Sequence, residues 1–399
     1  MRILRVAQDI FPETVGGAPY HIHALSRDQA AHGHDVTVLT ASDSVDEQET
    51  VERDGYTLIR QPPKVETLGN QLFTNTTRVL RNSEDYDVVH AHSHLFFSTN
   101  VAAAYCRLKD IPLAVTCHGL NSQRGPFWFS RAHLRTLGKW TYDSADVTFC
   151  YTDVEQSKLR EMGVNTDIAV VNNGIDTERF SPSGPKHNRI DAAVGPAIVF
   201  VGRLVDGKRP QDALASLAEI QDRCLDAQLF FCGDGPMRES LENTVAEKEL
   251  DDAVSFLGRV PYSEMPTVFR AADLFVLPSR TEGFPRTVLE ALACETPVVS
   301  SNLEQTAKIV EQTGTTVEVG DIEGLATAVS DLVEDKQLLS DLGKHGRQIV
   351  TARYDWEDMV RETTNILGQI AKISEPPATD RKGPSSPEIP AIRDETNIK

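Results

Sequence analysis

The stretch from Leu274 to Ser301 constrains the fold of this chain more than any other part of the sequence. LFVL (274–277) and PVVS (297–300) are short apolar runs typical of buried strands. Between them lie PSRTEG, which has the composition of a loop, and PRTVLEALAC, which has the apolar spacing of a helix with Pro285 at its first position. A strand, a loop, a helix and a strand in this order predict a parallel sheet with helices packed on it.

This unit carries two glutamates whose positions suggest a site. Glu282 stands in the loop after the first strand, where ligands of open parallel sheets gather, and the free N–H groups at the start of the following helix suit an anion. Glu290 lies inside the apolar helix. Because burying an unpaired carboxylate is costly, we expect Glu290 to face water, a partner or a ligand.

The bulk properties of the chain narrow the class of protein. Its 399 residues predict two domains, each large enough for its own core. A net charge of −19 argues against nucleic acid as a partner, because phosphate binding requires a basic surface. The six cysteines show no C-x-x-C spacing, so we expect reduced, buried thiols. With no secretion signal and no apolar run long enough to span a membrane, we expect a cytoplasmic protein.

The alternation of apolar runs and helical patterns divides the chain in two. In the first half we expect strands at 2–8, 36–40, 88–92, 112–118, 146–151 and 167–171, and in the second half at 197–202, 227–233, 254–258, 274–277 and 297–300. Both halves predict an α/β fold with a doubly wound parallel sheet. We place a first domain at 1–177, a linker at 178–196 and a second domain at 197–352. An amphipathic helix at 353–373 must dock on another surface, and the polar, Pro-rich tail at 374–399 is expected to be disordered.

Loops that follow strands supply further candidates. Gly16 and Gly17 would let the backbone approach a phosphate, although two adjacent glycines also suit a plain turn. Arg203 and Lys208 follow the strand at 197–202, where two fixed cations can neutralise a diphosphate. The alternative is a solvated basic loop, but Arg203 directly follows an apolar strand in a chain that is short of positive charge.

Several histidines lie at the ends of expected strands. His118, followed by a glycine, can donate to a substrate hydroxyl or carry a proton, or it can be structural. His90, His92 and His94 alternate, so on a strand they would point the same way. No cysteine or carboxylate cluster completes a zinc shell around them, so we predict no metal there and favour a strand end that borders a cleft.

Residues 124–142 form a basic, aromatic segment without a single acid. Its chemistry comes from Arg124, Phe127, Trp128, Phe129, Arg131, Arg135, Lys139 and Trp140. Such a segment can lie on anionic lipid headgroups, which would make the protein peripheral at the inner face of a membrane. The alternative is a helix that lines the cleft and packs its aromatic side chains inside.

Together these motifs resemble the family 4 glycosyltransferases, which have the GT-B fold. The matching stretches, in order, are GGAPYHIHALSRDQAAHGHDVTVLT, DVVHAHSH, TCHG, VVNNGIDTERFSP, VGRLVDGKRP, FCGDGPMRESLE, VSFLGRV, AADLFVLPSRTEGFPRTVLEALACETPVVSS and YDWEDMV. Each is weak by itself, but their order and spacing cover nearly all of residues 1–373.

The resemblance implies an architecture and a set of site residues. Two Rossmann-like domains would face a cleft, the first on the acceptor side and the second binding the nucleotide sugar, with the final helix crossing back to the first. Glu282 would contact hydroxyls of the donor sugar, Glu290 the ribose hydroxyls, and His118 the reacting sugar. The remaining donor-site residues would be Arg203 and Lys208 at the diphosphate, Arg259 and Val260 at the nucleobase, and backbone groups of Gly16, Gly17, Gly283, Phe284, Pro285, Arg286 and Thr287.

The resemblance also implies the reaction. A UDP-, GDP- or ADP-sugar would serve as donor, and its sugar would pass with retention of configuration to a glycan, lipid-linked or small-molecule acceptor, with no metal or cofactor. His118, Glu282, Arg203 and Lys208 are the expected catalytic residues. The two cations can replace a divalent metal ion, and no carboxylate is placed as a nucleophile, which agrees with the front-face mechanism usually proposed for the family. Cys294-Glu295 and Asp206-Gly207 depart from the family pattern and leave the donor open.

Three alternatives remain. A sugar-nucleotide epimerase or a phosphorylase of the same fold is the first, and an epimerase would convert a nucleotide sugar with no acceptor present. A non-catalytic nucleotide-sugar-binding protein is the second. A nicotinamide oxidoreductase is disfavoured because no G-x-G-x-x-G follows the first strand.

Overall fold

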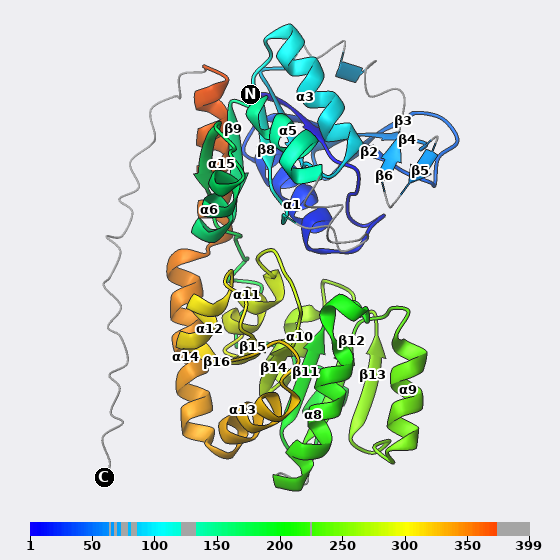
Figure 1. Cartoon of the computed structure of the whole chain (residues 1–399), viewed down its shortest axis with the longest axis vertical. Coiled ribbons are helices and arrows are strands. Elements are labelled where there is room, and N and C mark those ends of the chain that lie inside the picture. Colours follow the sequence, from blue (N-terminus) through cyan, green and yellow to red (C-terminus); the bar gives the residue numbers. More distant parts are fainter. Residues whose placement is uncertain are drawn as a thin grey trace.

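The computed structural model has two α/β domains, one above the other in Figure 1, each built around its own sheet. The structure describes residues 1–63, 65–67, 70–72, 79–80, 86–120, 133–223 and 226–372. The fold class predicted from the sequence is confirmed.

The sheet of the first domain has eight strands in the order β10-β9-β8-β7-β1-β2-β4-β3. The six predicted strands are β1 (Arg2–Val6), β2 (Asp35–Ala41), β7 (Val88–His92), β8 (Leu113–Thr116), β9 (Val147–Cys150) and β10 (Asp167–Val170), and all of them pair in parallel. Four strands were not predicted from the sequence: β3 (Glu49–Arg53) and β4 (Tyr56–Gln61), a hairpin that extends the sheet, and β5 (Val65–Thr67) and β6 (Asn70–Leu72), which form a small ladder.

Helices cover both faces of this sheet, which is why its central strands β1, β2, β7, β8 and β9 are buried along nearly their whole length. Along β1, Ile3 packs with Leu25 of α1 (Gly17–Ala31), while Leu4 points to the other face and packs with Ala102 of α3 (Phe97–Lys109). The domain also contains η2 (Leu134–Gly138), α5 (Lys139–Asp143) and α6 (Asp153–Glu161). The loops that follow the strands are thus held at one edge of a rigid sheet.

The second sheet is parallel throughout, in the order β13-β12-β11-β14-β15-β16. Its strands are β11 (Ala197–Val201), β12 (Gln228–Cys232), β13 (Val254–Gly258), β14 (Leu274–Leu277), β15 (Val298–Ser301) and β16 (Gly314–Val317). Around them lie α7 (Asn188–Asp191), η3 (Asp206–Lys208), α8 (Pro210–Arg223), α9 (Arg238–Glu247), α10 (Met265–Ala271), α11 (Arg286–Ala293), α12 (Ala307–Thr313), α13 (Ile322–Glu334) and α14 (Lys336–Arg353). The strand, helix and strand predicted within residues 274–301 are β14, α11 and β15, while α12 and β16 were not predicted.

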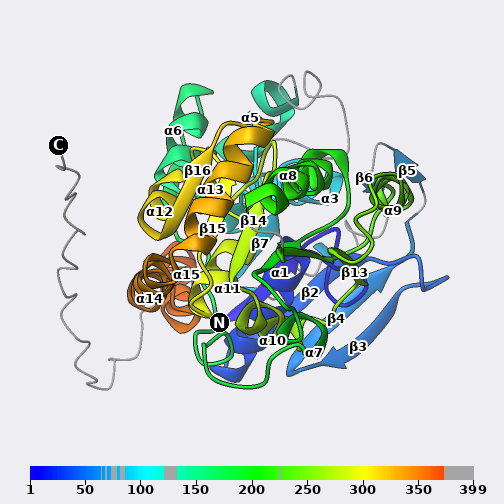
Figure 2. The ribbon, with the colours of Figure 1, turned by 90° about the horizontal axis from the view of Figure 1, so that it is seen from below.

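The last helix, α15 (Trp356–Ile370), returns to the first domain as expected and lies beside it in Figure 1 and next to α1 in the sequence-coloured view of Figure 2. Trp356, Met359 and Val360 join the apolar layer that includes Leu25 of α1. The indole Nε1 of Trp356 donates to Asp28 Oδ2 at 2.6 Å. The apolar face of α15 therefore has the docking surface that its sequence required.

Two expectations about the whole chain can be compared with the described residues. Cys106, Cys117, Cys150, Cys232 and Cys294 are free and buried, as predicted, while Cys224 lies outside the described residues. Among the helices that the structure describes, none has the length and apolar character needed to cross a bilayer.

Candidate functional site

Lys208 and Glu282 meet at the carboxyl edge of the second sheet. Lys208 ends η3, just after β11, and its Nζ forms an ion pair with Glu282 Oε1 in the loop after β14; the two side chains are 16% and 6% exposed. The two loops are also joined by Arg280, whose backbone N–H donates to Gly207 O at 2.9 Å and whose Nη1 pairs with Asp206 at 2.8 Å. Asp206-Gly207, which departs from the family pattern, thus fixes the loop that carries Glu282.

Glu290 is buried in α11 and has two partners. The hydroxyl of Tyr262 donates to Glu290 Oε1 at 2.9 Å, and Arg286 Nε lies 3.9 Å from the same oxygen. Burial raises the pKa of Glu290, and the charge of Arg286 and the hydrogen bond from Tyr262 oppose that rise. The carboxylate that the sequence placed in an apolar helix is therefore satisfied from within the protein.

Arg286 connects the second domain to the first. Its Nη1 donates to the carbonyl of Gly174 at 2.9 Å, and its guanidinium carbon lies 5.4 Å from the ring centroid of Tyr20 and 5.3 Å from that of Trp356. A Cβ added to Gly17 would lie 3.8 Å from Arg286 Cδ. The predicted glycine loop and the start of α11 therefore face each other across the domain boundary.

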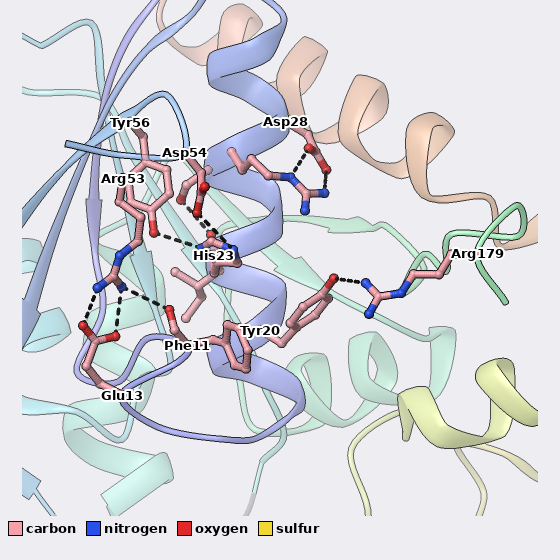
Figure 3. A network of polar contacts seen from close by, with 12 residues as sticks. Phe11, Glu13, Tyr20, His23, Asp28, Arg53, Asp54, Tyr56 and Arg179 are labelled. Carbon is pink, nitrogen blue, oxygen red and sulfur yellow. Dashed lines mark hydrogen bonds and ion pairs between the residues drawn. The ribbon is translucent and has the colours of Figure 1, made fainter. Parts of the chain in front are cut away.

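A tyrosine pair and an arginine extend this contact. The rings of Tyr20 and Tyr262 are 4.0 Å apart, and Arg179 bonds to both residues, through Nη1 to the Tyr20 hydroxyl at 3.2 Å and through Nη2 to the Tyr262 carbonyl at 2.7 Å. Figure 3 shows the Tyr20 hydroxyl pointing at Arg179. In the same view Arg53 holds Glu13, in the loop ahead of α1, through two hydrogen bonds of 2.9 and 2.6 Å.

His118 reaches this boundary from the first domain. Its Nδ1 lies 2.8 Å from the Tyr151 hydroxyl and its Nε2 lies 2.9 Å from His92 Nδ1. Burial lowers the pKa of His118 to about 4, so the ring is neutral near pH 7. A Cβ on Gly283 would lie 3.6 Å from the His118 carbonyl oxygen. His118 and the loop of Glu282 are therefore neighbours, although their sheets differ.

The three alternating histidines do not all point the same way. His90 and His92 do, with ring centroids 4.3 Å apart, as predicted for a strand. His94 instead pairs with the Tyr142 hydroxyl at 2.7 Å, because the chain leaves the strand at Ser93, which has a φ of 65°. Within the ranges that the structure describes, no group of three or more His, Cys, Asp or Glu side chains could hold a metal ion.

Other predicted donor-site residues lie around the same edge. Arg203 and Arg259 are exposed after β11 and β13, and Val260 packs, partly buried, on the core of the second domain. Gly16 caps α1, Thr287 is partly buried in α11, and Phe284 and Pro285 are buried just ahead of it. The part that each of these residues has in donor binding stays a prediction.

Sequence reasoning missed several residues that the fold brings to this boundary. Tyr151 follows β9, Asn173 follows β10 and donates to the Phe284 carbonyl at 3.0 Å, and Tyr262 follows β13. They follow the carboxyl ends of their strands by one, three and four residues, where ligands of parallel sheets gather, but a tyrosine or an asparagine in a loop is too ordinary for this position alone to single it out.

The basic aromatic segment is only partly visible, since residues 121–132 lie outside the described ranges and with them Arg124, Phe127, Trp128, Phe129 and Arg131. In the described part, Leu137 and Trp140 are 40% and 37% exposed, and Lys139 pairs with Asp143. The cleft-lining alternative requires Trp140 to be packed inside the protein, and it is not.

Two family models match the chain. The model of the group 1 glycosyl transferases covers residues 192–349, and that of Glycosyltransferase Family 4 covers residues 15–179. Each corresponds to one of the two sheet-centred domains.

Curated relatives and solved structures agree with the family models. A glycogen synthase of Mycobacterium tuberculosis is 29% identical over 92% of this chain and 94% of its own length. A GDP-mannose-dependent alpha-(1-6)-phosphatidylinositol monomannoside mannosyltransferase of Mycolicibacterium smegmatis is 26% identical over 92% and 98%. A sucrose-phosphate synthase from Thermosynechococcus elongatus superposes with a TM-score of 0.76 at 22% identity over 92% and 98% of the two chains. HepE of Anabaena, in complex with UDP-glucose, gives 0.75 at 20% identity over 92% and 100%. The chain is a glycosyltransferase of the EC 2.4 class and belongs to the group 1, family 4 enzymes with the GT-B fold.

Proposed function

We propose that this protein transfers a sugar from a nucleoside-diphosphate donor to an acceptor hydroxyl with retention of configuration and without a metal ion. The observation that carries the proposal is the pairing of Lys208 with Glu282 beside the start of α11, opposite His118 of the first domain. This arrangement puts a cation, a sugar-binding carboxylate and helical N–H groups at one edge of the sheet.

The residues take complementary roles in donor binding. Lys208 and Arg203 hold the diphosphate, and Glu282 accepts hydrogen bonds from sugar hydroxyls while Lys208 balances its charge. Glu290 receives the ribose hydroxyls, with Tyr262 already bonded to one of its oxygens. Neutral His118, whose two ring nitrogens lie within hydrogen-bond distance of Tyr151 and His92, exchanges one of these contacts for a hydroxyl of the reacting sugar.

In the transfer step the acceptor oxygen forms a bond to the anomeric carbon as the bond from that carbon to the diphosphate breaks. Both events occur on the same face of the sugar, and the proton of the acceptor hydroxyl passes to the leaving phosphate oxygen. Lys208 and Arg203 stabilise the negative charge that develops on the diphosphate, which is the task of a divalent ion in other enzymes.

The acceptor belongs to one of two classes that the names of the relatives suggest. The glycogen synthase supports a growing glucan as acceptor, and the mannosyltransferase supports a phosphatidylinositol-linked glycan. The name of the mannosyltransferase makes GDP-mannose, and the complex of HepE makes UDP-glucose, the first donors to test, with ADP-glucose as the third nucleotide class.

The test is a transfer assay with UDP-glucose, ADP-glucose and GDP-mannose against glucan and glycolipid acceptors. One donor is expected to raise the melting temperature and to be consumed only with acceptor, giving an α-linked product by NMR, with turnover unchanged to within about twofold in excess EDTA. Conversion of a nucleotide sugar without acceptor would instead identify an epimerase. Release of sugar 1-phosphate from the glucan in the presence of inorganic phosphate would identify a phosphorylase, and donor binding without transfer a non-catalytic protein. Loss of activity in EDTA would contradict the metal-independent mechanism.

We also propose that the first domain contacts an anionic membrane through the segment 124–142. Trp140, Lys139 and Arg107, together with Asp143, line an open pocket of about 590 Å³. The exposed indole of Trp140 can enter the interface between headgroups and acyl chains.

Arg135→Gln and Trp140→Ala are each expected to weaken binding to vesicles that contain phosphatidylglycerol, roughly fivefold for the lost charge. Co-sedimentation measures it, with vesicles of phosphatidylcholine alone for comparison. The matched control is Leu338→Ala, an exposed leucine of the second domain, which should bind as the wild type does. Equal binding by all three variants would overturn the membrane proposal.

A further inference from the structure

Glu155 is buried, and hydrogen bonds within the helix start use only one of its two carboxyl oxygens. It stands in the first turn of α6, where its backbone N–H donates to the Thr152 hydroxyl at 3.1 Å and its Oε2 accepts from the N–H of Tyr151 at 2.9 Å. This is a cap of the helix start, and it uses one carboxyl oxygen. The other oxygen, Oε1, is buried and has no hydrogen-bond partner, on a residue that is 1% exposed.

The unpartnered oxygen faces the other domain. A Cβ added to Gly283, in the loop of Glu282, would lie 3.9 Å from Glu155 Oε1, and its two nearer neighbours are the His118 carbonyl oxygen at 3.6 Å and Gly119 Cα at 3.7 Å. All three contacts belong to the first domain, and Asn173 adds its bond to the Phe284 carbonyl. The loop that the proposed function assigns to the donor sugar thus closes directly over Glu155.

The surroundings of Glu155 disfavour a negative charge. Burial raises the pKa of Glu155 to about 7, from an ordinary value of 4.5. The cation that acts on it is Lys158, one turn further along α6, which also pairs with Glu304 of the second domain. The other ionisable groups that face it from β8, α5 and β9 are the thiols of Cys117 and Cys150 and the hydroxyls of Tyr142 and Tyr151, all of them neutral near pH 7 because burial raises each pKa.

We propose that Glu155 is a positioning residue that holds the Glu282–Phe284 loop against the first domain, and that closure of this loop on a bound donor takes up a proton at Glu155. A protonated carboxyl gains an O–H donor for the loop, whereas a carboxylate leaves an unpaired charge under it. The inference rests on the proposed function, because it assigns the donor sugar to this loop. The inference predicts that donor affinity depends on pH. The helix cap formed by Glu155 and the proposed donor contacts would not by themselves produce this dependence.

The sign of the pH dependence follows from the direction of the shift. The loop adds to the burial that raises the pKa of Glu155 to about 7, so closure is most favourable at low pH and loses that advantage as the pH rises through about 7. Donor affinity is therefore expected to fall about tenfold between about pH 5.5 and pH 7.5. Titration calorimetry of the full chain with UDP-glucose, ADP-glucose and GDP-mannose measures the donor affinity at each pH. Repeating the titrations in two buffers of different ionisation enthalpy measures the proton uptake.

Glu155→Gln keeps an oxygen for the helix cap and imitates the neutral acid, so its donor affinity is expected to stay near the low-pH value of the wild type throughout. Glu161→Gln, on the exposed side of the same helix, is the matched control and should keep the pH dependence of the wild type. A purely structural role for Glu155 would lower the melting temperature of Glu155→Gln and leave the slope of affinity against pH as it is in the wild type.

The outcomes separate the inference from the proposed function. If none of the three nucleotide sugars binds the wild type, the proposed function is overturned and the inference falls with it. If one binds without proton uptake and with the same affinity across the pH range, the inference alone is overturned. The measurement of proton uptake uses the wild-type protein, so it decides the question even where Glu155→Gln does not fold.

Discussion

Replacing Lys208 by methionine is expected to slow sugar transfer by about a hundred- to a thousandfold. Its ammonium group stands at the carboxyl end of β11, beside Glu282, where the proposed mechanism puts the leaving diphosphate as it gains charge in the transition state. Methionine keeps most of the length and apolar volume of the side chain and removes only the charge. Turnover at saturating donor measures the effect, and near-normal turnover would overturn the assignment of Lys208 to the site.

The same substitution is also expected to destabilise the fold, so the two effects must be separated. Glu282 is 6% exposed, and without Lys208 its charge stays buried and unpaired, which lowers the free energy of unfolding by up to about 3 kcal/mol. The double variant Lys208→Met/Glu282→Gln has no buried charge, so its stability should return towards that of the wild type while transfer stays lost. Arg361→Gln removes half of an exposed ion pair on α15 and should change neither quantity.

The strands that the sequence predicts most clearly are those buried along their whole length. β11 and β14 are uniformly apolar, so their patterns are unambiguous. β3 and β16 lie at the edges of their sheets, and the sequences ETVER and GTTV carry no apolar run because these strands are largely exposed or only partly buried. Edge strands obtain their hydrogen bonds from a neighbour that the local sequence does not reveal.

The candidate site also contains residues that the sequence could reveal and residues that it could not. Lys208, Glu282 and Glu290 could be selected because a charge beside or inside an apolar element requires an explanation. Glu155 and Tyr262 could not, since a Thr-x-x-Glu helix start and a tyrosine in a loop are both ordinary. What makes them notable is the other domain, which covers the free oxygen of Glu155 and stacks Tyr20 on Tyr262. Contacts of this kind depend on how the two sheets are joined, and no local pattern contains that information.

Arg286→Met is expected to cost about 3–5 kcal/mol in the free energy of unfolding, measured by urea titration. The guanidinium is 7% exposed and serves three parts of the chain at once, since it bonds to the Gly174 carbonyl, lies over Tyr20 and Trp356, and faces Glu290. Sequence reasoning used only the backbone of Arg286 as a donor to phosphate. The side chain of Arg286 matters for stability, because its loss leaves buried Glu290 with only the weaker influence of Arg179 to balance its charge.

The pH dependence of that loss identifies which contact matters most. Burial already raises the pKa of Glu290, and removing Arg286 raises it further. A group whose pKa is raised by folding loses stability as the pH rises through the folded value, so Arg286→Met should be more destabilising at about pH 8 than at about pH 5. Adding Glu290→Gln removes the charge, and the double variant should lose the extra destabilisation at high pH. If the loss is instead the same at both pH values, Arg286 stabilises the protein through Gly174, Tyr20 and Trp356, and its ion pair with Glu290 contributes little.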